Sequence, residues 1–137
     1  SSKFKINRYY QKGSLPGYQA VQASHAAVDF QHQHPQIAKD WNKNSNYLII
    51  LSVENEEQLK KLIWKFQKSN LCHTVFREPD IDNQITAICV EPSEKTRKLT
   101  AHLPLALTEF NDSVTKDNKI CLYLHRKLKL KAMKTFY

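Results

Sequence analysis

Three histidines, His25, His32 and His34, lie close together and are the first candidates for chemistry. Imidazole exchanges a proton near neutral pH, so a histidine can act as a general acid or base, and it is also a common metal ligand. A helix would put His25 and His32 on one face, but no cysteine or suitable carboxylate lies nearby to complete a metal site. We therefore expect no metal and no cofactor. His25 remains a candidate base, and the alternative is a packed, hydrogen-bonded histidine.

The cysteines show no sign of a catalytic or metal-binding pair. Cys72, Cys89 and Cys121 are odd in number and widely spaced, and they contain no C-x-x-C pair. Neither a disulfide framework nor a zinc site is indicated, and a reducing compartment fits this usage. No apolar run is long enough to span a membrane, and no charged-then-apolar leader is present. We expect a cytoplasmic protein that does not contact a membrane.

Basic residues outnumber acidic ones. The chain has 21 Lys and Arg against 13 Asp and Glu, a net charge of +8. This balance favours a polyanionic partner, and nucleic acid is the natural candidate. The basic residues gather near both ends, at Lys3, Lys5, Arg8 and Lys12 and at Lys116, Lys119, Arg126, Lys127, Lys129, Lys131 and Lys134. The alternative is that these terminal charges only keep the protein soluble.

The two tryptophans could stack on nucleic-acid bases. Trp64 stands beside Ile63 in a predicted helix and is more typical of a core residue. Trp41 falls in a predicted loop and is the better stacking candidate, with anchoring of that loop as the alternative.

The elements that must position these residues follow an alternating pattern. Strands are predicted over 4–10, 47–53, 73–77 and 84–90, helices over 18–33, 55–68 and 94–102, and a loop over 36–45. This order predicts an α/β domain, a mixed sheet with helices packed on it. The nearly continuous apolar run over 47–53 is typical of a strand covered on both faces, so we place it at the centre of the sheet.

The helices over 55–68 and 18–33 differ in pattern. In the first, the apolar residues recur at helical spacing, at Leu59, Leu62, Ile63 and Phe66. Asn55 can cap its amino end, and Glu56 and Glu57 suit its dipole. In the second, one face is marked by Val21, Ser24, His25 and Val28.

The length of 137 residues fits one domain. We expect this domain to cover residues 1–107, followed by a basic C-terminal extension over 108–137. In the extension Ile120, Leu122 and Leu124 alternate with Cys121, Tyr123 and His125, and Leu128 and Leu130 alternate with lysines. Alternation with a period of two favours a strand, here one with a cationic face.

The segment from Gly17 to Ala26 reads G-Y-Q-A-V-Q-A-S-H-A. It resembles the signature helix of the archaeal and eukaryotic type of peptidyl-tRNA hydrolase, usually written G-K-x-x-A-Q-x-x-H-A. Gly17, Gln22, His25 and Ala26 match, and the resemblance extends more loosely over about residues 4 to 107. It implies a mixed four-stranded sheet flanked by helices, hydrolysis of the ester joining a peptide to tRNA, and basic surface that grips the tRNA. A homodimer is compatible with it.

The chain departs from the family pattern at several positions. Tyr18 and Val21 stand where the motif has lysine and alanine. Glu78 stands in place of an aspartate near the end of the third strand. Asn83 replaces a threonine, and Thr86 is the nearest threonine in that region.

The resemblance implies a site built from these positions. His25 would take a proton, Glu78 would orient His25 or the attacking water, and Thr86, Asn83 or Tyr18 would donate to the oxyanion. The alternative for Glu78 is an ordinary surface carboxylate. The residues expected to contact the substrate are Tyr18, Gln22, Asn83, Arg77, Lys12 and Trp41.

Three functions follow from these observations. The first is a peptidyl-tRNA hydrolase or a related esterase that acts on the acylated 3′ end of tRNA. The second is a catalytically degenerate relative that binds tRNA or another RNA. The third is a protein-interaction module whose tail strand pairs with the sheet edge of a partner. The first two require that the helix over 18–33 and the acidic loop after residue 78 face each other.

Overall fold

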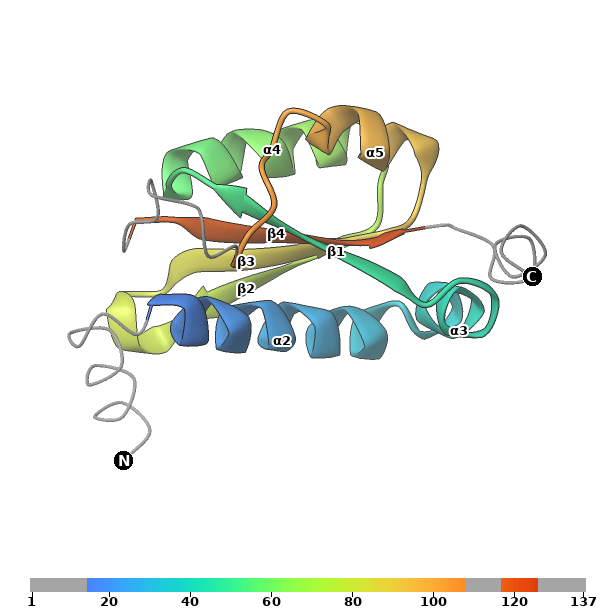
Figure 1. The fold of residues 1–137 in the computed structure, drawn as a ribbon, viewed down its shortest axis with the longest axis horizontal. Helices are drawn as coiled ribbons and strands as arrows, with labels where there is room; N and C mark the ends of the chain where they lie inside the picture. Colours follow the sequence, from blue (N-terminus) through green and yellow to red (C-terminus); the bar gives the residue numbers. More distant parts are fainter. Residues whose placement is uncertain (1–14, 108–116, 126–137) are drawn as a thin grey trace.

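A mixed four-stranded sheet forms the centre of the molecule in the computed structural model, which describes residues 15–107 and 117–125 (Figure 1). The strands are β1 (Tyr47–Val53), β2 (His73–Glu78), β3 (Gln84–Val90) and β4 (Lys119–His125). Their order is β1-β4-β3-β2, in which β3 and β4 run parallel and the other two pairs antiparallel. The predicted α/β class is confirmed. The strand predicted over 4–10 lies outside the described residues.

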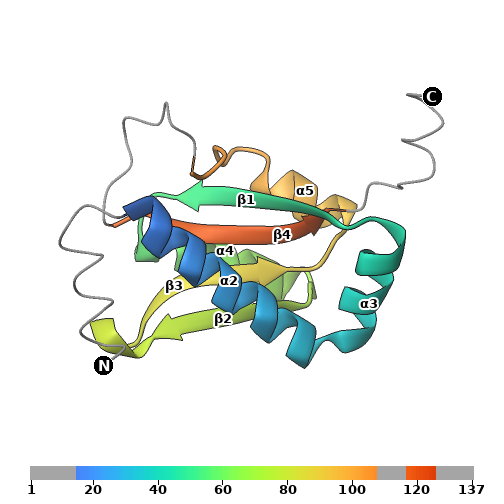
Figure 2. The same ribbon diagram turned by 60° about the horizontal axis from the view of Figure 1, so that its bottom comes forward.

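Helices cover both faces of the sheet (Figures 1 and 2). The helices α2 (Leu15–Gln33) and α3 (Pro35–Asn44) pack on one face, and α4 (Glu56–Lys68) and α5 (Glu94–Thr100) pack on the other. A single 3-10 turn, η1 (Pro79–Ile81), joins β2 to β3. We call the α2 and α3 side the α2 layer and the other side the α4 layer.

The two central strands of the sheet are β4 and β3, and the run over 47–53 that the sequence placed at the centre is β1, at one end of the strand order. Within the described residues β1 has β4 on one side and only the isolated bridge from Leu51 to Leu105 on the other. Tyr47 and Leu48 are correspondingly 37% and 43% exposed. An apolar run reports burial but not the order of strands, and this is why the prediction was wrong.

The position of β4 also corrects the predicted domain boundary at residue 107. Residues 119–125 lie between β1 and β3 and are buried along almost the whole strand. Ile120, Leu122 and Leu124 pack into the α2 layer, while Cys121 and Tyr123 pack into the α4 layer. This strand belongs to the domain. Its backbone already pairs on both sides, so it is not available to join the sheet of a partner.

The segment over 36–45 is a helix rather than the predicted loop. Pro35 occupies the first turn of α3, where a missing N–H costs nothing. Ala38 and Trp41 are one turn apart and both buried, and the Trp41 Nε1 donates to the Tyr47 carbonyl at 2.8 Å. The segment is short and mostly polar, so its sequence did not indicate a helix. The buried Trp41 stabilises it.

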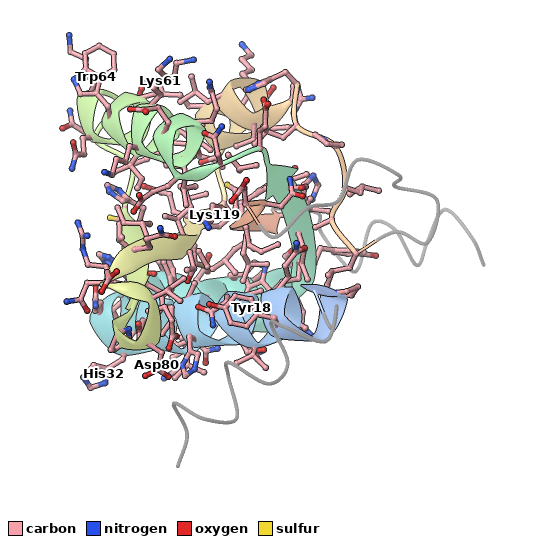
Figure 3. All side chains as sticks on the ribbon, turned by 90° about the vertical axis from the view of Figure 1, so that its left-hand side faces the viewer. Tyr18, His32, Lys61, Trp64, Asp80 and Lys119 are labelled. Atoms are coloured by element: carbon pink, nitrogen blue, oxygen red, sulfur yellow. The ribbon has the colours of Figure 1, made fainter. Side chains whose placement is uncertain are left out.

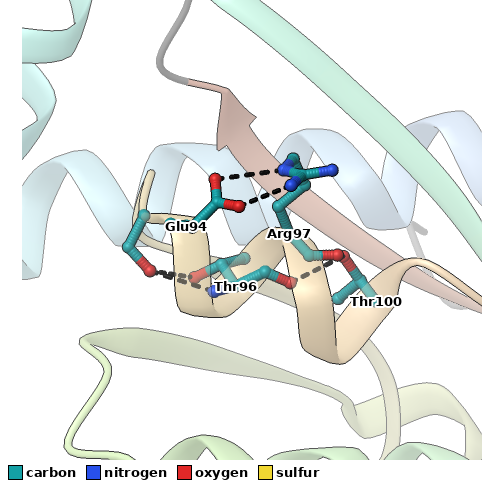
Figure 4. Close-up of polar contacts among 5 residues, drawn as sticks. Glu94, Thr96, Arg97 and Thr100 are labelled. Carbon is teal, nitrogen blue, oxygen red and sulfur yellow. Dashed lines mark hydrogen bonds and ion pairs between the residues drawn. The ribbon is translucent and has the colours of Figure 1, made fainter.

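The helices of the α4 layer agree with their sequence patterns. The Asn55 side chain caps α4 by accepting from the Gln58 N–H at 2.9 Å, and the four predicted core residues of α4 are buried. Figure 4 shows the corresponding cap of α5, where the Ser93 Oγ accepts from the Thr96 N–H at 3.0 Å. Trp64 differs from expectation, because its side chain is 57% exposed and not in the core.

Candidate functional site

The orientation of α2 on the sheet determines which residues can form a site. Val21 and Val28, which mark the face noted in the sequence, are 49% and 64% exposed. The opposite face packs on the sheet and carries Ala23, Ala26 and Phe30 together with Gln19 and Gln22. Two glutamines therefore lie between the helix and the sheet, while two valines face solvent.

Gln22 is the centre of a buried polar network that joins α2, β2 and β3. Its Nε2 donates to the Glu78 Oε2 at 3.3 Å, and the Thr86 Oγ1 donates a short hydrogen bond to its Oε1. Gln22, Thr86 and Glu78 are 1%, 2% and 3% exposed. The carboxamide has both ends satisfied, which orients it and spares the cost of burying it unpaired.

A β-bulge turns Thr86 toward Gln22. The pairing of β2 with β3 shifts between Phe76, which opposes Ala87, and Arg77, which opposes Ile85. Thr86 is therefore the extra residue of the pair and has no partner in the register. Bulges redirect side chains and are common beside active sites. Here the bulge lets both Thr86 and Ala87 contribute to the α2 side of the sheet.

His25 lies at the surface beside this network. Its ring stacks on Phe76, with the centroids 4.4 Å apart and the planes 5° apart, and the residue is exposed. The next residue of α2 also contacts β2, because the Thr74 Oγ1 donates to the Ala26 carbonyl at 3.2 Å. Gln22, His25 and Ala26 thus meet alternate residues of β2. The helix and the end of β2 face each other as expected, but Glu78 bonds to Gln22, and no described hydrogen bond joins it to His25.

The turn after β2 is fixed by backbone contacts. The Asn83 N–H donates to the Glu78 carbonyl at 3.0 Å, and the Arg77 Nη1 donates to the Asn83 carbonyl at 3.1 Å. Asp82 and Asn83 both have φ of 57°, in the left-handed region that Asp and Asn tolerate better than most residues. The turn holds Glu78 at the end of its strand, while the side chains of Arg77 and Asn83 are exposed.

The other predicted site residues lie in different surroundings. Tyr18 lies on α2 one turn before Gln22, and both residues are buried; Figure 3 shows the position of Tyr18 on this helix. Trp41 is 7% exposed and its N–H is occupied, so its ring offers no face to a base, and its prediction as a stacking residue was wrong. Lys12 lies outside the described residues.

The sequence assigned substrate contact to Gln22 and did not identify it as the centre of the network. One signal was present. Gln22 lies on the same side of the predicted helix as Ala26 and next to Ala23. Small residues at this spacing favour close packing of a helix on a sheet. A glutamine within such a face must be buried and bonded.

The described part of the chain carries no net charge if histidine is counted as neutral. Over the described residues Lys and Arg equal Asp and Glu in number, so the net charge of +8 comes from residues 1–14, 108–116 and 126–137. In the described part of the chain no three His, Cys, Asp or Glu side chains are placed to hold a metal ion. The described helices include none long and apolar enough to cross a membrane.

Comparison with known proteins gives one family. The family model described as Peptidyl-tRNA hydrolase PTH2 matches residues 13–106, which include α2, β2, β3 and all three residues of the network. No significant match was found among curated proteins or among solved structures. The matched range ends before β4, so one of the two central strands of the sheet comes from sequence outside the match.

Proposed function

The chain belongs to the Peptidyl-tRNA hydrolase PTH2 family, and from this premise we propose that it hydrolyses the ester joining a peptide to the 3′ end of tRNA. The observation that carries the proposal is the buried hydrogen-bond chain from Thr86 through Gln22 to Glu78, next to the exposed His25. Buried polar networks are costly unless complete, and this one is complete around a β-bulge.

Ester hydrolysis needs a base for the attacking water and donors for the developing oxyanion. His25 is the exposed imidazole beside the network and is assigned the base. Its ring is held by Phe76 on one side, and its helix is held on the sheet through Gln22. Asn83 and Tyr18 stay candidates for the oxyanion donor, and Arg77 and Lys12 stay candidates for tRNA contact.

Glu78, Gln22 and Thr86 act in this proposal as positioning residues. The Thr86 hydroxyl fixes the Gln22 carbonyl, so that the amide N–H points at Glu78. The carboxylate in turn lies two residues beyond Phe76, the residue on which His25 stacks. Loss of any link would let the helix and the end of β2 move relative to each other, and a displacement of 1 Å can change a rate by about two orders of magnitude.

The test measures release of peptide from a peptidyl-tRNA by the full-length protein. His25→Ala should lower kcat/KM by about 10²-fold or more, since a general base contributes roughly 10² to 10⁴. His32→Ala is the matched control, because His32 is also exposed on α2. Equal turnover by the two variants would remove His25 from the mechanism.

A second pair of variants tests the network. Thr86→Val removes the hydroxyl that bonds Gln22, whereas Thr74→Val removes the hydroxyl that bonds the Ala26 carbonyl, and both threonines are 2% exposed. We expect kcat to fall about tenfold or more for Thr86→Val and to stay within about twofold for Thr74→Val. Equal kcat values would show that the network serves stability alone.

The burial of the network also supports an alternative function, RNA binding without hydrolysis. Gln22, Glu78 and Thr86 are at most 3% exposed, so an ester cannot reach them in this conformation. Tyr18 stands where the family motif has lysine. Salt-sensitive binding of tRNA together with no release of peptide would favour this alternative.

A further inference from the structure

We propose that the outer face of α4 binds single-stranded nucleic acid, with the bases stacked at Trp64 and the phosphates on the lysines around it. This surface lies on the opposite side of the sheet from the network of Gln22, Thr86 and Glu78. The inference does not depend on hydrolase activity, because it uses only residues of the α4 layer.

The first observation is the exposed indole. Trp64 is 57% exposed, although its neighbours Ile63 and Phe66 are 8% and 0% exposed on the same helix. Figure 3 shows Trp64 and Lys61 projecting outward from α4, far from Tyr18 in the α2 layer. An indole left in water at the cost of apolar exposure is a natural platform for a base, since every base has a π face.

The second observation is the set of cations around the indole. Four exposed lysines share this face of α4, namely Lys60, Lys61, Lys65 and Lys68. The Lys68 Nζ lies over the ring, 4.7 Å from its centroid. Of the other three, Lys60 also has its Nζ 3.9 Å from the Glu56 Oε1, a long contact in which the lysine side chain is 56% exposed, so the pair contributes little and does not prevent contact with a phosphate.

The third observation is the shape beside these lysines. A shallow hollow of about 390 Å³ adjoins Trp64 and is lined by Glu57, Lys60, Lys61 and Lys65. A second, deeper cavity of about 640 Å³ shares Lys61 and Lys65 and continues toward Gln58 and His102. Lys61 and Lys65 therefore form a ridge between two hollows, roughly 6 Å apart along the helix axis.

Together these features fit an unpaired strand better than a duplex or an acidic protein. The backbone would follow the Lys61 and Lys65 ridge, one base would stack on Trp64, and the next nucleotide would enter the deeper cavity. That cavity also contains the carboxylates of Glu54 and Asp117, which repel phosphate but can accept hydrogen bonds from base amino groups. An acidic peptide would use the lysines and leave the indole without a stacking partner.

The distribution of charge also favours the α4 layer as the nucleic-acid-binding side of the molecule. On α4 and α5, Lys and Arg outnumber Asp and Glu by seven to three, whereas on α2 and α3 the two kinds are equal. A strand of phosphates is thus attracted to the α4 layer in preference to the α2 layer within the described residues.

The test measures binding of a short oligouridylate to the full-length protein at several salt concentrations. The double variant Lys61→Gln with Lys65→Gln should reduce the slope of log K against log salt by about 1.4, at about 0.7 for each phosphate that a lysine no longer neutralises. Lys39→Gln with Lys43→Gln is the matched control, because these exposed lysines have the same spacing on α3. An equal fall in slope for both pairs would overturn the proposal and indicate unspecific attraction.

The stacking is tested separately at Trp64. Trp64→Ala should weaken oligouridylate binding about tenfold, and Trp64→Phe should restore a large part of the affinity, because phenylalanine keeps a ring face. Fluorescence of the wild type should be quenched by the oligomer, while Trp64→Phe, which keeps only the buried Trp41, should show little quenching. Unchanged affinity in Trp64→Ala, or polyglutamate binding as tightly as the oligomer, would overturn the proposal. The partner would then be an acidic protein and not a nucleic acid.

Discussion

The two helix layers of the sheet differ in where they place polar and apolar residues. On α4 the apolar residues other than Trp64 face the sheet and the lysines face water. On α2 the glutamines Gln19 and Gln22 face the sheet, while Val21 and Val28 face water. Hydrophobic burial alone accounts for the first arrangement. The second requires specific bonds between buried polar groups, and it is there that the candidate catalytic residues meet.

The two layers also bury one charged residue each, in different ways. Glu78 under α2 accepts from Gln22 within a complete network. Lys119 begins β4 on the side of Cys121 and Tyr123, and its Nζ donates to the Gln84 Oε1 at 3.4 Å. Burying a carboxylate costs free energy even when it is hydrogen-bonded, so stability alone does not explain Glu78. A role in function would explain it.

Removal of β4, on which both layers pack, is expected to have the largest effect on folding. Ending the chain after residue 107, the boundary predicted from sequence, removes β4 and exposes the facing edges of β1 and β3. We expect this shortened chain not to fold cooperatively, measured by circular dichroism and urea unfolding. A cooperative transition would show that the two layers can assemble without β4.

Within α4, two neighbouring aromatic residues should differ sharply. Phe66→Ala removes a ring that is 0% exposed and should lower the free energy of unfolding by about 3 to 5 kcal/mol. Trp64→Ala should change it by about 0.5 kcal/mol or less, because the indole lies largely in solvent. Urea unfolding compares both variants, and a large loss for Trp64→Ala would mean that the indole supports the fold.

Gln22→Leu tests the polar arrangement of α2. The substitution leaves the Glu78 carboxylate and the Thr86 hydroxyl buried without their partner, so stability should fall by about 2 to 4 kcal/mol. Gln58→Leu, at an exposed position of α4, is the control and should stay within about 0.5 kcal/mol. A neutral Gln22→Leu variant would show that the network contributes no stability.

Lys119 allows a test of the buried charge in the α4 layer. Burial lowers the pKa of Lys119, with Asp117 and Glu56 acting in the opposite direction. Lys119→Met should therefore stabilise the protein by about 1 kcal/mol at neutral pH. Exposed Lys98→Met serves as the control.

The pH dependence of this gain has a definite sign. A lowered folded pKa means that the unfolded chain holds more protons, so wild-type stability rises as pH passes from the folded pKa toward the ordinary value near 10.4. The advantage of Lys119→Met should shrink over that alkaline range. A gain that is constant with pH would assign the effect to packing.

The smallest effect is expected on the exposed face of α2. Val28→Ser should change the free energy of unfolding by about 0.5 kcal/mol or less, since Val28 is 64% exposed. Leu62→Ser on α4 is the comparison and should cost several times more, because Leu62 is 4% exposed. A large loss for Val28→Ser would show that this face is covered in solution.

Local signals in the sequence were accurate where one interaction dominates. The Asn55 cap, the four core positions of α4 and the strands over 47–53 and 84–90 follow from spacing and residue type alone. The motif that includes Gln22 and His25 also led to the correct family. The helix α3 was missed because its ten residues contain few apolar side chains, and only contact with the rest of the protein stabilises so short a helix.

The sequence by itself determined the α/β class, the family, and the helix that bears His25, and it placed Glu78 one residue beyond the end of its strand. Only the tertiary structure decided that β4 fills the centre of the sheet, that α2 turns its glutamines inward, and that Thr86 is a bulge residue bonded to Gln22. The physical reason is one of range. Periodicity and capping act within a few residues, whereas the pairing of β1 with β4 and the bond from Thr86 to Gln22 join positions 64 or more residues apart, whose geometry no local pattern records.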